Sequence, residues 1–333
     1  MKFFRGCSLT RLDFDGYDRN WPLAFSVSSL NCLGAGGQPS QSTRSIAQPT
    51  WSPVYFGIRV TFSVTMLTVL ALSAVNDSGV RSERYLCNTN TTQSMSLSGC
   101  ADALGIELGS ICGQAQEARG ESGDGVLWSV WECVCPGPIW LAYLTHQTLL
   151  IQNVYLLLAA YTTWMGKDYV KGAGPSGVPA GTPVGPWYVR AVWLLHSVQV
   201  AGTFLVFALF WGLVFDGTFS ALVTPPTHGL NWAVSVLDWW LSKQPTYCIH
   251  VIWAFMFAFW YCLFLVAWWA SGATTCHGDN YIYAALDLNQ GAATWALMVG
   301  ICLVAVPAAY GIFVAVIKTC RVVGGDVVPP SDD

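Results

Sequence analysis

Long apolar runs separated by short polar segments fill most of the chain after its first fifty residues. Five of these runs cover residues 54–75, 138–165, 188–215, 248–270 and 294–317. About 20 mainly apolar residues cross the hydrocarbon core of a bilayer as a helix, so each of the five runs predicts a membrane span. A sixth run, 226–241, is shorter, at roughly 24 Å of helix. The sequence TPPTHG, residues 224–229, overlaps its start.

Counting the short run as a span predicts an all-α integral membrane protein, a bundle of six transmembrane helices with both termini in the cytosol. The polar segments then alternate between the two sides of the membrane. They are a largely disordered cytosolic tail, 1–50, a Cys-containing lumenal or extracellular loop, 76–137, a Gly/Pro-rich cytosolic loop, 166–187, a lumenal loop, 271–293, and a cytosolic tail, 318–333.

Composition agrees with lipid as the main solvent. The 333-residue chain is 53% hydrophobic and only 10% charged, whereas soluble domains carry roughly a quarter charged residues. There is no basic stripe that would bind phosphates, so nucleic acid is not an expected partner. Membrane lipids are the expected partners.

The basic residues indicate which side is which. Of the 15 Lys and Arg residues, Arg81, Arg84 and Arg119 fall in the outer segments and Arg59 falls within the first span. The other eleven lie on the side that holds both termini, as the positive-inside rule requires of the cytosol. Without the short span, the C-terminal basic residues would move outside and weaken this bias.

The long loop 76–137 carries features of an oxidising compartment. Asn76 and Asn90 each begin a glycosylation sequon there. Clustered cysteines suggest disulfides, although sequence alone does not give their pairing. The candidates are Cys87, Cys100, Cys112, Cys133 and Cys135 in this loop, with Cys276 in the second outer loop. Endoplasmic reticulum and plasma membrane both fit.

Ionisable residues within the spans are few, and such residues are functional candidates by default. Arg59, near the cytosolic end of the first span, is expected to extend its guanidinium outward to water. Asp238, near the cytosolic end of the short span, is expected to pair with Lys243 at the interface.

Thr145 and His228 stand at similar depth near the outer ends of the second and fourth spans. If these helices are neighbours, an imidazole could activate the hydroxyl as a nucleophile. Two simpler interpretations remain open. The Thr145 hydroxyl would bond the carbonyl four residues earlier, and His228 would be an interfacial residue at a helix start.

Several ordered motifs resemble the rolling stone family of multi-pass membrane proteins. They are YLTH at 143–146, THGLN at 227–231 with Asp238 behind it, and DNYIY at 279–283 followed by Leu286 and Asp287. The resemblance covers about residues 138–320 and leaves out the N-terminal tail and the cysteine loop.

The rolling stone family is in turn similar to the androgen-induced and androgen-dependent membrane proteins. That resemblance implies a hydrolase of esters between fatty acids and hydroxy fatty acids, with Thr145 as nucleophile, His228 as base and Asp287 as the orienting group. This chain departs from the related pattern at Ala284, where the family has proline, and at Asp287, where it has glutamate. No cofactor or metal is required.

Two other functions remain open. The protein could act without catalysis, in cell–cell interaction or fusion, by binding a protein partner through loop 76–137. It could also carry electrons across the membrane through two haems, because imidazoles are good axial ligands. The four histidines that would hold the haems are His146, His196, His228 and His250.

Overall fold

The computed structural model describes residues 52–77, 115–121, 127–133, 137–171, 185–215, 224–242, 244, 248–275 and 279–324. These residues form two compact units. In the described part, the first unit comprises the residues up to Leu70, residues Thr148–Phe259 and the residues from Val299 onward. The second unit comprises Ala71–Gln147 and Trp260–Met298. The boundaries fall inside helices, so some helices contribute to both units.

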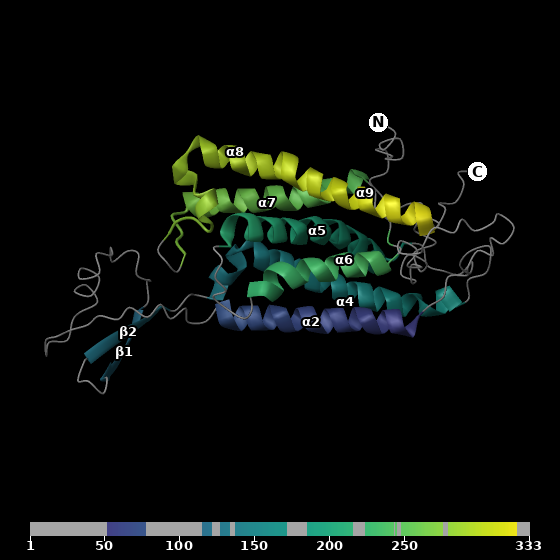
Figure 1. Cartoon of the computed structure of the whole chain (residues 1–333), viewed down its shortest axis with the longest axis horizontal. Helices are drawn as coiled ribbons and strands as arrows, with labels where there is room; N and C mark the ends of the chain where they lie inside the picture. Colours follow the sequence, from purple (N-terminus) through teal and green to yellow (C-terminus); the bar gives the residue numbers. More distant parts are fainter. Residues whose placement is uncertain are drawn as a thin grey trace. The chain divides into compact units, whose positions relative to one another are not determined.

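Helices make up almost all of the described chain (Figure 1). In order they are α2 (Pro53–Asp77), α4 (Leu144–Lys171), α5 (Trp187–Leu209), α6 (Asn231–Leu241), α7 (Val251–Ala270), α8 (Ala292–Gly300) and α9 (Val306–Gly324). Three π-helical turns adjoin them, at Phe210–Val214, Pro226–Leu230 and Ile301–Ala305. Short 3-10 turns lie at Gly137–Ala142, Cys248–His250, Ala284–Leu286 and Leu288–Gln290.

The helices of the first unit pack around α5. In the most apolar stretch of α5, 67% of the residues are buried, whereas the corresponding figure for α2 and for α7 is 28%. The core of this unit includes Met66, Leu149, Trp193 and Val234, which come from four different helices. A central α5 is therefore positioned to share side-chain contacts with α4 and α6.

Gly202 sets the closest approach of α5 to α4. A Cβ at this position would lie 2.9 Å from the Thr148 Cγ2 methyl, closer than real Cβ atoms come to other heavy atoms. Glycine removes that obstruction and allows the two helices to touch at this level.

The second unit has a separate core. Ala142, Tyr261, Leu265, Ile282 and Leu288 are buried together there. Tyr261 donates its hydroxyl proton to the Ala142 carbonyl at 2.9 Å, which joins α7 to the chain just before α4. This unit therefore has both an apolar core and a polar link between segments 119 residues apart.

Four helical stretches are long and apolar enough to cross a membrane, and they are Pro53–Val75, Trp187–Leu213, Cys248–Ala270 and Ala292–Ala315. Helices suit this environment because each satisfies its own backbone hydrogen bonds. The prediction of a helical membrane protein is confirmed. The two further predicted spans differ from these four, because α4 carries polar residues such as Gln152 and Asn153 and α6 has only 11 residues. A total of six spans stays a prediction, as do the cytosolic termini.

One element departs from the all-α prediction. Strands β1 (Ala115–Glu121) and β2 (Leu127–Cys133) pair as an antiparallel hairpin, with Ala115 opposite Cys133 and Glu121 opposite Leu127. It lies within the loop predicted at 76–137. β2 is rich in Trp and Val, which favour strands, but this seven-residue signal is short beside the long apolar runs.

Candidate functional site

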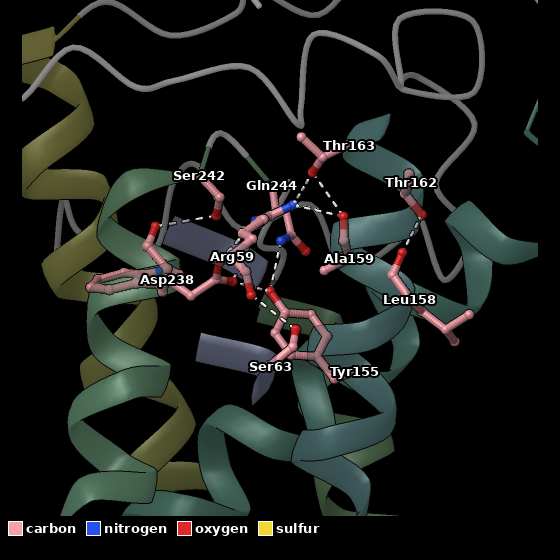
Figure 2. Close-up of polar contacts among 11 residues, drawn as sticks. Arg59, Ser63, Tyr155, Leu158, Ala159, Thr162, Thr163, Asp238, Ser242 and Gln244 are labelled. Atoms are coloured by element: carbon pink, nitrogen blue, oxygen red, sulfur yellow. Dashed lines mark hydrogen bonds and ion pairs between the residues drawn. The ribbon is translucent and has the colours of Figure 1, made fainter. Parts of the chain in front are cut away.

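A buried ion pair joins α2 to α6 inside the first unit (Figure 2). Arg59 Nε donates to Asp238 Oδ1 at 2.9 Å, and its Nη2 donates to Oδ2 at 3.4 Å. Both side chains are 0% exposed. The two-point contact matches the planar guanidinium to the carboxylate and brings the net charge of the pair to zero, which is how two ions can remain within an apolar bundle.

This pair corrects two sequence-based interpretations. Arg59 does not extend to water, and Asp238 is buried and paired with Arg59 rather than placed at the interface. Lys243, the predicted partner, lies outside the described residues. The partners are 179 residues apart in the sequence. A charged side chain that is paired inside the bundle does not have to reach water at the interface. The sequence near Asp238 does not reveal that its partner is Arg59.

Further polar groups surround the pair, all of them in the first unit. Arg59 Nη1 donates to the Ala159 carbonyl at 3.2 Å and to Thr163 Oγ1 at 2.8 Å, both on α4. The Tyr155 hydroxyl donates to Asp238 Oδ2 and accepts from Gln244 Nε2 at 2.7 Å. Figure 2 shows these side chains converging from three helices. The cluster connects α2, α4 and α6 through charged hydrogen bonds.

Thr145, the predicted nucleophile, lies in the second unit, in the first turn of α4, and is buried. The Leu144 backbone N–H donates to the Tyr283 hydroxyl at 3.0 Å. The first N–H groups of a helix have no partner within the helix, so Tyr283 supplies one from outside. This contact brings the phenol next to Thr145, whose hydroxyl hydrogen-bonds to it.

The surroundings keep the Tyr283 phenol protonated at neutral pH. Burial raises the pKa of Tyr283 to about 12, and the hydrogen bonds that its oxygen makes with the Leu144 N–H and with the Thr145 and Tyr261 hydroxyls only partly offset this rise. Tyr283 is therefore a hydrogen-bond donor at neutral pH and is a poor proton acceptor.

His146 follows Thr145 and has a defined tautomer. Its Nδ1 lies 2.7 Å from the Trp140 carbonyl oxygen, and a carbonyl can only accept, so Nδ1 carries a proton. In the neutral imidazole, Nε2 then holds the lone pair. The ring stacks on Trp140 with centroids 4.5 Å apart and planes 11° from parallel. Such a fixed orientation is what a histidine base needs.

Asp287, the predicted orienting residue, lies in the second unit and engages its own loop. Its Oδ1 accepts from Asn289 N and Asn289 Nδ2, each at 2.9 Å. It thereby caps the 3-10 turn Leu288–Gln290. Its backbone carbonyl accepts from Thr294 Oγ1 at 2.8 Å, at the start of α8. These contacts give Asp287 a structural role in shaping the loop that carries Tyr283.

His228, the predicted base, lies in the first unit, in the π-helical turn Pro226–Leu230. Its ring stacks on Phe210 at 3.6 Å between centroids, with planes 18° apart. Its Nδ1 lies 3.0 Å from both the Thr224 carbonyl oxygen and Thr227 Oγ1. The structure thus places Thr145 and Asp287 in one unit and His228 in the other, and the pairing of Thr145 with His228 stays a prediction.

The other predicted sites fall mostly on chain that the structure does not describe. The Asn76 side chain, Asn90 and the side chains of all six disulfide candidates lie outside the described residues. Among cysteines with described side chains, Cys262 and Cys302 are reduced, whereas Cys248, in the 3-10 turn before α7, is disulfide-bonded. No group of three or more His, Cys, Asp or Glu suited to a metal ion occurs in the described part.

The disulfide at Cys248 and the basic residues disagree on sidedness. Disulfides are rare in the reducing cytosol, yet the positive-inside argument places the turn before α7 there. Eleven of the 15 basic residues favour the cytosol for this side and one disulfide opposes it, so the sidedness stays a prediction.

The predicted haem ligands have other surroundings. The His196 ring lies 5.5 Å from the Tyr155 ring in the first unit, and the His146 ring stacks on Trp140.

Sequence reasoning missed five buried amides among the described residues: Gln152, Asn153, Gln199, Asn231 and Gln244. A signal existed: residues 231, 235, 238 and 242 are all polar and follow helical spacing within an apolar run.

The chain is similar to the protein rolling stone of Drosophila melanogaster, with 23% identity over 117 residues. The match covers 34% of this chain and 42% of the relative, so less than half of that protein is matched. It supports the resemblance to the rolling stone family, whereas the link to the androgen-induced proteins stays a prediction. No family model and no solved structure matches. With the four apolar helices, this relative supports a multi-pass integral membrane protein.

Proposed function

We propose that this multi-pass membrane protein hydrolyses long-chain acyl esters, with Thr145 as the nucleophile. The observation that carries the proposal is the buried contact between the Thr145 hydroxyl and the protonated Tyr283 phenol at the first turn of α4. A nucleophilic hydroxyl beside a fixed O–H donor is the pair of groups that acyl transfer requires, because negative charge develops on the carbonyl oxygen during attack.

The reaction proceeds in two steps. Thr145 Oγ1 bonds to the ester carbonyl carbon while its proton passes to a histidine. The carbon–oxygen bond to the alcohol then breaks, and the alcohol leaves with that proton. Water next attacks the acyl-threonine, which releases the fatty acid and restores the hydroxyl. Tyr283 donates its hydrogen bond to the oxyanion in both steps.

The test is ester hydrolysis by the purified full chain in detergent, with 4-nitrophenyl palmitate and an ester of a hydroxy fatty acid as substrates. Thr145→Ala should abolish activity, while Thr145→Ser should retain part of it because the hydroxyl is kept. Tyr283→Phe should lower kcat by about 100-fold, the usual effect of removing one oxyanion donor. Full activity in Thr145→Ala would reject the assigned nucleophile.

The base is assigned by comparing two variants. His146 belongs to the same unit as Thr145, and the contact with Trp140 fixes its tautomer. His228 is the base that the family resemblance implies. Loss of activity in His146→Ala alone would assign His146, and loss in His228→Ala alone would assign His228. Retained activity in both would remove histidine from the mechanism.

The β1–β2 hairpin supports a second candidate function. It gives loop 76–137 a folded element, and an isolated two-stranded hairpin is marginally stable in water without something to pack against. We propose as the alternative that this loop binds a protein partner in cell–cell interaction. Deleting residues 77–131 should then abolish the cellular phenotype while Thr145→Ala leaves it intact. The reverse result would favour the hydrolase.

A further inference from the structure

Two buried glutamine side chains and the Asn231 backbone carbonyl meet at the Ser235 hydroxyl inside the first unit. Gln152 comes from α4, Gln199 from α5 and Asn231 from the start of α6. None is more than 1% exposed. We refer to these three residues, grouped around the Ser235 hydroxyl, as the amide cage.

Hydrogen bonds hold the cage together. Gln152 Nε2 donates to the Asn231 carbonyl at 2.6 Å and to Ser235 Oγ at 2.8 Å. Ser235 Oγ lies 2.7 Å from Gln199 Oε1 and also receives the Thr203 hydroxyl at 3.2 Å. Each glutamine therefore uses one end of its amide on Ser235, and the position of the other end is fixed as a result.

The opposite ends of these amides have no protein partner. Among the described residues, Gln152 Oε1, Gln199 Nε2 and Asn231 Nδ2 are buried and receive or donate no hydrogen bond. Exchanging the amide atoms of Gln152 would place its oxygen 2.6 Å from the Asn231 carbonyl oxygen, which also only accepts, so Gln152 Oε1 is the end without a partner. Exchanging those of Gln199 would leave an unpartnered oxygen in place of Nε2. The cage thus presents an acceptor and donors that the protein leaves unused.

Unused polar atoms at this depth are costly. A buried amide atom without a hydrogen bond has lost the bond that it made to water in the unfolded chain, and Gln152 Oε1 and Gln199 Nε2 are two such atoms. Lipid cannot supply the missing bonds. Both amides are held by the same Ser235 hydroxyl. An occupant that serves both must donate to Gln152 Oε1 and accept from Gln199 Nε2, and a water molecule can do both.

We propose that the amide cage binds an ordered internal water molecule. The water donates to Gln152 Oε1 and accepts from Gln199 Nε2, and its second proton faces the backbone and hydroxyl oxygens around Ser235. Buried waters make about three hydrogen bonds to polar groups that would otherwise be unsatisfied. This site is separate from the Thr145 cluster and does not depend on the proposed hydrolase activity.

The water extends a polar line along α6. Asn231, Ser235, Asp238 and Ser242 follow one another at helical spacing, and all four are buried. The line begins in the amide cage and passes the Arg59–Asp238 pair, so hydration at Ser235 brings water within about one helical turn of a buried carboxylate.

The experiment is a structure of the full chain in lipid nanodiscs by electron cryo-microscopy, at a resolution that shows ordered water. A density peak within hydrogen-bond distance of both Gln152 and Gln199 is expected in the wild-type protein. A direct bond between the two amides, or amides in these positions without a peak between them, overturns the proposal. The wild-type map decides the question even where variants fail to fold.

A matched pair of variants shows whether the cage holds the water. Gln199→Met keeps the length of the side chain and removes its polar atoms, so the peak should be lost. Thr162→Val is the control, because the buried Thr162 hydroxyl bonds only the Leu158 carbonyl of its own helix among the described contacts, and the peak should remain. Persistence of the peak in Gln199→Met would contradict the assignment.

Discussion

Arg59 and Asp238 show how a single contact can determine whether a side chain belongs in the membrane. Taken alone, each is a charged residue near the end of an apolar helix, and its side chain would be expected to point out of the bundle toward water. Together they make two hydrogen bonds, and Tyr155 and Thr163 satisfy further atoms. Sequence could identify both residues as unusual, but it could not pair them across 179 positions.

Breaking this pair should destabilise the first unit strongly. Arg59→Met leaves Asp238 buried with Tyr155 as its main donor, and loss of one partner of a buried ion pair typically costs about 3–5 kcal/mol. The double variant Arg59→Met with Asp238→Leu should recover much of that loss, because no lone charge remains. The measurement is unfolding in mixed detergent micelles, followed by tryptophan fluorescence.

Ser63→Ala provides the control for this series. The Ser63 hydroxyl is buried on the same helix but bonds only the Arg59 carbonyl among the described contacts, at 2.9 Å, so its loss should cost about 1 kcal/mol or less. Equal destabilisation by Ser63→Ala and Arg59→Met would contradict a special role for the ion pair.

At the scale of elements, the apolar runs predicted most of what is helical. The runs at 54–75 and 248–270 correspond closely to α2 and α7, because a long apolar segment in lipid has few alternatives to a helix. The π-helical turns were not predictable in this way, since the hydropathy of a π turn equals that of an α-helix. The Tyr283–Leu144 contact was also out of reach, because it joins residues 139 positions apart.

The α4–α5 contact gives a prediction at this scale. Gly202→Ala should destabilise the protein by about 1–3 kcal/mol, the usual effect of forcing a methyl group into a packed interface, because its Cβ would meet Thr148 Cγ2 at 2.9 Å. Thermal unfolding of the purified protein measures the loss. Gly311→Ala in α9 is the matched control, since no atom lies within 4 Å of a Cβ there, and alanine favours a helix over glycine. A Gly202→Ala protein as stable as Gly311→Ala would reject the close contact.

At the scale of the whole molecule, the orientation in the membrane is the main open prediction. The basic residues place both termini in the cytosol, so epitope tags at either end should become accessible only after cells are permeabilised. Asn76 or Asn90 should carry glycan. An exposed C-terminal tag on intact cells would mean that the chain crosses the membrane an odd number of times or in the opposite direction, and an oxidised Cys248 in cells would then agree with it.

The electron-transfer hypothesis is tested on the same purified material. We expect a colourless protein whose reduced-minus-oxidised spectrum lacks haem bands, because the His146 ring stacks on Trp140 and the His196 ring lies 5.5 Å from the Tyr155 ring, so both imidazoles already pack against aromatic side chains. Sharp haem bands that disappear in both His146→Ala and His196→Ala would overturn the proposed hydrolase.

The separation between Arg59 and Asp238 also has a consequence for how the chain is made. α2 is synthesised early, whereas the carboxylate that neutralises Arg59 follows 179 residues later. At typical rates of synthesis of 5–20 residues per second, the interval is about 9–36 s. During that time the newborn helix holds an unmatched cation. Until α6 arrives, the guanidinium has only α4 oxygens or the water at the interface as partners. Ribosome-bound chains that end before residue 231 should therefore be extracted from the membrane by alkali more readily than chains whose α6 has left the ribosome.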